Sequence, residues 1–208
     1  MTRPRRLSLL AALVLGAIPT QAFAHFVLVS PSSWAAQDGL GSPQKSAPCG
    51  QADPGATATP SGAVTTVQAG SQLTITVNEV IFHPGHYRVL LAADQAGLPA
   101  DPAVTADASS PCGSTTIDPN PTMPLLADGV LQHTAPLGSQ KSFQVTLPQG
   151  FTCAHCTLQV VEFMSNHPLN NPGGCYYHHC ADLSIVAPDG GAAVADGGTT
   201  GTPDAGVD

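Results

Sequence analysis

The chain has 208 residues, of which 6 are basic and 14 acidic, giving a formal net charge of −8. Three of the basic residues lie within the first 24 positions, so a chain without that segment would carry three basic residues against 14 acidic ones, a net charge of −11. So acidic a surface excludes nucleic acid and anionic membranes from the expected partners.

Residues 1–24 have the pattern of an export signal. Three arginines precede an apolar run from Leu7 to Ile18, which is shorter than the roughly 20 residues that a membrane span needs. Ala22-Phe23-Ala24 has the small-x-small form after which signal peptidases cut. We therefore expect cleavage between Ala24 and His25, a secreted, periplasmic or cell-surface protein, and no membrane span.

Cleavage at this point would make His25 the first residue of the processed chain. Its α-amine would have a pKa of roughly 7.7–8.0, low enough to lose its proton and bind a metal near neutral pH. The amine and the ring Nδ1 can chelate one ion, and a second imidazole would complete a planar set of three nitrogens. Such a set suits Cu(II).

Residues 25–187 predict strands rather than helices. Leu73–Val77 alternates apolar residues with threonine, as a half-buried antiparallel strand does. Stretches rich in Pro, Gly, Ser and Asp, such as Leu98–Thr122 and Asn166–Gly174, separate this run from the others. We therefore predict an all-β domain, an immunoglobulin-like (fibronectin type III-like) two-sheet sandwich with long disulfide-stapled loops. The other predicted strands are Phe26–Val29, Tyr87–Ala92, Phe143–Leu147, Thr157–Phe163 and Leu183–Val186.

All cysteines follow the predicted signal. An even count of 6 in an exported chain predicts three disulfides, and the sequence leaves all 15 pairings open. The alternative is a zinc ribbon built from Cys153-x-x-Cys156 and two downstream cysteines, which an oxidising compartment disfavours. The cysteines are Cys49, Cys112, Cys153, Cys156, Cys175 and Cys180.

Two histidines are candidates for the second imidazole. His83 and His86 flank a Pro-Gly turn before a predicted strand, from which a side chain can reach the amino terminus. His178 and His179 are adjacent on a predicted strand and therefore point to opposite faces, so at most one of them approaches a given metal. The remaining histidines, His133, His155 and His167, we expect at the surface or in loops.

Residues 188–208 predict a disordered tail. They are rich in Gly, Ala, Asp and Thr and have no aromatic residue and no apolar period, so they bury too little surface to fold. The expected organisation is thus a signal at 1–24, one β-sandwich domain at 25–187 and the tail.

Four segments together resemble the lytic polysaccharide monooxygenases and their copper-binding relatives with a histidine brace. They are His25–Pro31, His83–Tyr87, Cys156–Gln159 and Cys180–Ile185, in the family's order and across the predicted domain. The resemblance implies one copper per chain, bound by His25 through its amine and Nδ1 and by His83 through Nε2. Tyr177, five residues before Asp182, falls where the family has its axial Tyr or Phe, and the resemblance assigns it to the catalytic centre.

The activity that the resemblance implies is oxidative cleavage of polysaccharide chains by an oxidoreductase that uses O2 or H2O2. The expected partners are a chitin-like or cellulose-like polysaccharide and an electron donor, and we expect a monomer. Two alternatives stay open: a copper carrier or scavenger that uses the same brace without catalysis, and a plain disulfide-bonded adhesion or wall module. The chain departs from the family in having one tryptophan, Trp34, and His178 beside Tyr177 as a further nitrogen donor.

Overall fold

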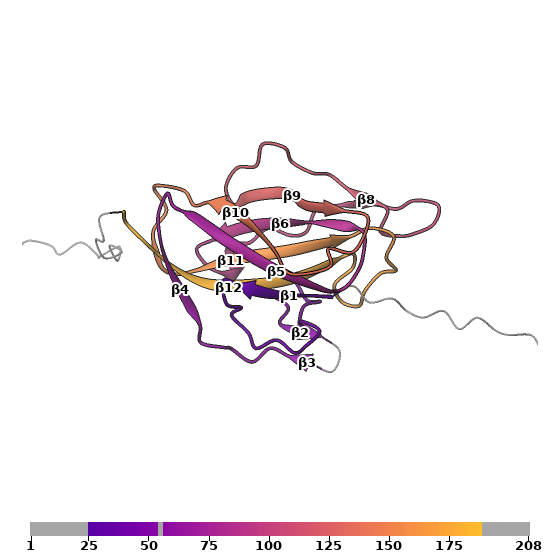
Figure 1. Cartoon of the computed structure of the whole chain (residues 1–208), viewed down its shortest axis with the longest axis horizontal. Coiled ribbons are helices and arrows are strands. Elements are labelled where there is room, and N and C mark those ends of the chain that lie inside the picture. The colour runs from indigo at the N-terminus through magenta and orange to yellow at the C-terminus, as the bar shows by residue number, and fades with distance from the viewer. Residues whose placement is uncertain (1–24, 54–55, 189–208) are drawn as a thin grey trace, which may run out of the picture.

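Two β-sheets face each other in this computed structural model, which describes residues 25–53 and 56–188 (Figure 1). The smaller sheet has the order β1-β5-β10, with β1 at His25–Ser30, β5 at Gln72–Ile81 and β10 at Lys141–Thr146. The larger sheet has the order β4-β12-β11-β6-β9. Its strands are β4 (Val64–Gln68), β6 (Gly85–Ala92), β9 (Leu125–His133), β11 (Cys153–Met164) and β12 (Tyr176–Val186).

All pairings within the two sheets are antiparallel except that of β4 with β12. Two short two-stranded hairpins lie in the loops, and a single turn of 3₁₀-helix spans Gln95–Gly97. Within the described residues, no helix has the length and apolarity of a membrane span. The hairpins pair β2 (Ala52–Asp53) with β3 (Ala56–Thr57) and β7 (Val104–Thr105) with β8 (Ser114–Thr115).

The core lies between the sheets and follows from the alternation of side chains. In β5 the apolar residues Leu73, Ile75 and Val77 are buried and the threonines between them face outward. They meet inward-facing residues of β11 and β12, including Leu158 and Leu183, in one cluster. In Figure 1, β1 and β5 cross over the strands of the larger sheet. The all-β sandwich predicted from the sequence is confirmed.

Each of the six strands predicted from the sequence is present, five of them within the observed bounds and the sixth, Phe143–Leu147, running one residue past β10. The prediction missed β4 and β9 and the four two-residue strands. The predicted signal lies outside the described residues, as does the predicted tail apart from Pro188.

The six cysteines form three disulfides, as predicted. Cys49 is bonded to Cys180, Cys112 to Cys175, and Cys153 to Cys156. The zinc-ribbon alternative is wrong, because its four cysteines are distributed over three different disulfides. Cys112–Cys175 ties the long loop after β6 to the start of β12, where the candidate site lies.

Candidate metal centre

Strand register brings His25 close to the turn that carries His83. In the pairing of β1 with β5, His25 lies opposite Ile81, the last residue of β5, and His83 follows two positions later. The pairing thus brings the start of β1 next to the end of β5, more than fifty residues later in the chain. His25 and His83 are close enough for the charge of one to affect the titration of the other.

A third histidine, His167, completes the cluster; it lies in a loop, one of the two expected positions, but it is buried there and not at the surface. Its ring centre lies 4.5 Å from that of His83, at an interplanar angle of 66°. Two hydrogen bonds hold the two loops together, because the backbone N–H and the hydroxyl of Ser165 both donate to the Pro84 carbonyl, at 2.7 and 2.9 Å. The His167 ring is also fixed by a hydrogen bond between its Nδ1 and the Pro168 carbonyl.

The three rings are buried, with exposed fractions of 7% for His25, 5% for His83 and 1% for His167. Burial, followed by the nearby His167 and His25, lowers the pKa of His83 to about 4. His83 is therefore neutral at physiological pH, which is the form in which an imidazole binds a metal.

Tyr177, at the start of β12, packs against the first of these histidines. Its ring centre is 5.2 Å from that of His25, with the planes tilted by 52°. The side chain is completely buried, and its hydroxyl donates to Asn170 Oδ1 at 3.3 Å. Tyr177 therefore covers one side of the His25 ring.

These residues fit a copper ion in their chemistry. His83 has a buried ring nitrogen, Nδ1, without a hydrogen-bond partner, and neutral imidazoles of this kind suit Cu(II). The resemblance implies Nε2 as the ligand atom, and a half-turn of the ring about χ2 exchanges the two edges. In the 208-residue chain the α-nitrogen of His25 is an amide joined to Ala24, so the amine ligand exists only after cleavage.

The other candidate histidines lie elsewhere. His86 contacts Phe163 and lies 3.8 Å from Asp128, and burial is the main cause of its lowered pKa. His179 points into the core, where its Nε2 is 3.0 Å from the Phe26 carbonyl, and burial lowers its pKa to about 4. His178 points to the opposite face, so the expected split of the adjacent pair is confirmed.

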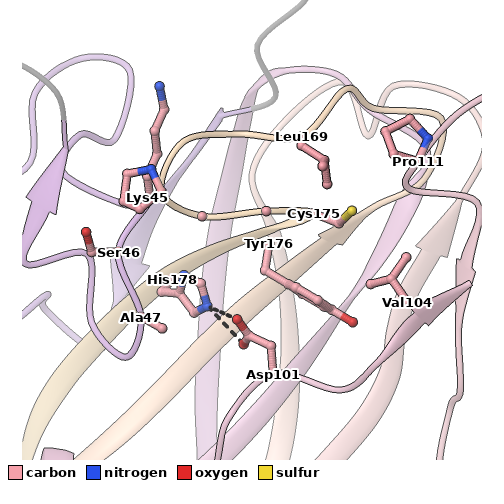
Figure 2. A pocket seen from close by; sticks show the side chains of 13 residues that line it. Lys45, Ser46, Ala47, Asp101, Val104, Pro111, Leu169, Cys175, Tyr176 and His178 are labelled. Atoms are coloured by element: carbon pink, nitrogen blue, oxygen red, sulfur yellow. Dashed lines mark hydrogen bonds and ion pairs between the residues drawn. The ribbon is translucent and has the colours of Figure 1, made fainter. Parts of the chain in front are cut away.

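His178 lies in a cavity on the outer face of β12, away from the three rings. The cavity has a volume of about 660 Å³, and Figure 2 shows His178 next to Asp101 in its lining, with Nε2 2.9 Å from both carboxylate oxygens. None of His25, His83, His167 and Tyr177 lines this cavity. His178 therefore belongs to a separate surface feature.

The expected position at the surface or in a loop is right for His155, which is exposed, and for His167, which lies in a loop, and wrong for His133, which ends β9. The His133 ring is 7% exposed and hydrogen-bonded to Glu79. A partial signal for His167 exists in the strand pattern. His167 comes shortly after the end of β11, and His83 comes shortly before the start of β6. Because β6 and β11 are antiparallel neighbours, these two strand ends lie side by side.

Comparisons with known proteins add a family and two solved structures. The family described as lytic polysaccharide mono-oxygenase, cellulose-degrading, matches residues 25–183. A lytic polysaccharide monooxygenase AA15 from Thermobia domestica in the Cu(I) state is 20% identical, with a TM-score of 0.37, over 58% of this chain and 62% of that one. A chitin binding domain from Burkholderia pseudomallei is 11% identical, with a TM-score of 0.44, over 78% of this chain and 100% of that one.

A comparison with curated proteins gives no match. The alignment with the Thermobia structure spans about 62% of that chain's length. Both structural likenesses are too distant to bear on the site.

Proposed function

The chain belongs to the lytic polysaccharide mono-oxygenase family, and on that premise we propose that its processed form is an exported copper protein that cleaves polysaccharide chains oxidatively. One copper ion per chain would be bound by His25 and His83. The observation that carries the proposal is the β1–β5 register, which sets His25 opposite Ile81 and so beside the turn of His83.

Three further observations support the site. The family match begins at residue 25, the position at which we expect the signal to be removed. His83 has a pKa of about 4 and is therefore unprotonated when the metal arrives. His167 packs edge-on against His83 and restricts the orientations of that ring.

Copper, when bound, supplies one-electron redox chemistry with O2 or H2O2, and the net reaction with peroxide inserts one oxygen into a sugar C–H bond and releases the other as water. The protein's own residues hold and shield that centre. Tyr177 shields the His25 ring with an apolar surface, and Asn170 fixes the Tyr177 hydroxyl. We assign the polysaccharide to the chitin or cellulose class and propose an electron donor as the second partner.

A paired comparison tests this function. The processed chain beginning at His25 should bind one Cu(II) with an axial spin-resonance spectrum and release oxidised oligosaccharides from cellulose or chitin when given a reductant and peroxide. Mass spectrometry of the soluble products measures the activity, and His83→Ala serves as the inactive control. Tight copper binding without oxidised products would instead favour the non-catalytic carrier, and absence of copper binding would exclude both.

A further inference from the structure

Three ionisable side chains converge between the two sheets, at a place distinct from the histidine cluster. Glu79 comes from β5 in the smaller sheet, whereas His133 ends β9 and Glu162 lies in β11, both in the larger sheet. One potential ligand atom from each lies within 4.8 Å of the other two. The cluster therefore bridges the two layers of the sandwich.

Glu162 is the residue that needs explanation. Its side chain is completely buried, and neither carboxylate oxygen has a hydrogen-bond partner. The Tyr87 hydroxyl lies near enough to favour the ionised carboxyl, but it too has no partner with hydrogen-bond geometry. Burial first, and the charge of Glu79 second, raise the pKa of Glu162 well above its usual range. A carboxyl in such surroundings is stable only with a proton or a cation beside it.

The His133 ring points its Nε2 atom towards the carboxyl groups of this cluster. Its Nδ1 lies 2.8 Å from the Leu131 carbonyl, which only accepts, so Nδ1 carries a hydrogen. Its Nε2 lies 2.9 Å from Glu79 Oε1, so either a proton or a metal ion links the two atoms. Two ligand atoms that are each about 2.1 Å from a tetrahedral zinc ion lie about 3.4 Å apart, so binding would require Nε2 and Oε1 to separate by about 0.5 Å.

The backbone around His133 is shaped to hold this orientation. Gly129 and Leu131 both have positive φ, at 67° and 50°, where the pairing of β9 with β6 is irregular. For leucine this conformation is unfavourable, and it persists only where the surrounding structure enforces it. The Glu79 carboxylate is also held in place, because the Leu137 N–H donates to its Oε2 at 2.8 Å.

We propose that Glu79, His133 and Glu162 form a second metal site, structural in role, for a divalent cation of the zinc type. The two carboxylates neutralise the charge of such an ion, and one imidazole with two carboxylates is a donor set that zinc accepts. The hydrogen bonds from Leu137 and to Leu131 orient the ligands, as outer partners do in metal sites.

An ion at this position would connect the two sheets and steady the turn before β6. Glu79 Oε1 accepts a 3.4 Å hydrogen bond from the backbone N–H of His83. The core site is nevertheless independent of the copper proposal, because it needs no cleavage at His25.

Metal counting tests the proposal. The processed chain is stripped with chelator under mild denaturant, refolded with one equivalent of Cu(II) and excess Zn(II), and desalted. We expect two metal ions per wild-type chain by elemental analysis and one per chain in Glu162→Gln. Asp182→Asn is the matched acid-to-amide control on the neighbouring strand and should retain two.

Thermal unfolding of the copper-loaded chain provides the second measurement, which does not depend on the variant folding. A zinc concentration of about a hundred times Kd should raise the Tm of the wild type by about 5–10 °C. A single ion in the wild type together with no such rise, or two ions in Glu162→Gln, would overturn the proposal. A chain with one residue added before His25 should lose copper yet keep zinc, which separates failure of the core site from failure of the copper site.

Discussion

The two ionisable clusters differ in what keeps each one stable before any ion binds. In the histidine cluster, burial holds the pKa of His83 at about 4, so that ring is neutral near physiological pH. The Glu79–His133–Glu162 cluster contains two carboxyl groups and must take up a proton or a cation to remain in the interior. Without a metal, the neutral His83 ring therefore adds no buried charge to the fold. The core cluster, in contrast, needs a bound proton or cation for the fold to be stable.

Their dependence on processing differs as well. All ligands of the core cluster are side chains supplied by the folded chain, whereas the proposed copper site lacks its amine while His25 is joined to Ala24. A single proteolytic event would thus switch one site and leave the other unchanged.

The largest effect should come from one extra residue before His25. An amide nitrogen then replaces the amine, and the loss of that ligand should weaken Cu(II) binding about a thousandfold. Competition titration against a chromophoric chelator measures the change. Equal affinity of the extended and the processed chains would refute the brace.

Next comes the second imidazole. His83→Ala should weaken Cu(II) binding about a hundredfold in the processed chain, because one of its ligands is removed. His86→Ala is the matched control and should change the affinity less than about threefold, since His86 contacts Phe163 and Asp128 instead. The opposite order of the two variants would move the second ligand to His86.

A smaller effect is expected at His167. His167→Gln removes the ring that packs 4.5 Å from His83, and loss of such a positioning contact should weaken copper binding about tenfold. Spin-resonance hyperfine couplings of the copper-loaded variant report whether the metal environment changes. An unaltered spectrum with unaltered affinity would show that the ring only fills space.

The pH dependence of stability tests the lowered pKa of His83 directly. Between pH 6.5 and 4 the unfolded chain protonates His83 while the folded chain does not, so stability falls as the pH is lowered through this window. We expect a contribution of about 1–2 kcal/mol, measured as the difference in urea unfolding between wild type and His83→Gln without metal. A parallel pH profile in the two proteins would contradict the lowered pKa of His83.

The smallest change is Tyr177→Phe. It removes the hydroxyl that donates to Asn170 but keeps the ring against His25, so stability should fall by about 0.5–1.5 kcal/mol. Copper affinity should remain within about twofold, because the phenyl ring still covers His25. Denaturant unfolding and the chelator titration provide the two readings.

Local patterns in the sequence were sufficient for the strands with clear alternation and for the count of disulfides. They were insufficient for β9, whose residues are mostly half-buried and which contains Gly129 and Leu131 at positive φ, so no period of two is visible. They also missed β4, an outer strand with largely exposed side chains. The disulfide pairing depends on contacts between distant segments and was open until the fold was known.

The candidate site shows the same division. His25 and His83 carry local signals, a cleavage motif and a Pro-Gly turn, which is why both could be predicted as ligands; that role stays a prediction. His167 carries only a partial signal, because its burial results from the pairing of β6 with β11, which the local sequence of its loop does not specify. Glu79 and Glu162 are separated by more than eighty residues and lie in different sheets, so no spacing rule connects them.

The contact between the His83 loop and the His167 loop also depends on the absence of a side chain at Gly85. At Gly85, a Cβ atom would lie 1.9 Å from the Phe163 carbonyl oxygen, so any side chain there would force β6 and β11 apart. The neighbouring Ser165–Pro84 bonds would stretch with them, and His83 would separate from His167. A side chain at position 85 would therefore disturb the candidate site from the strand junction, without touching any of its histidines directly.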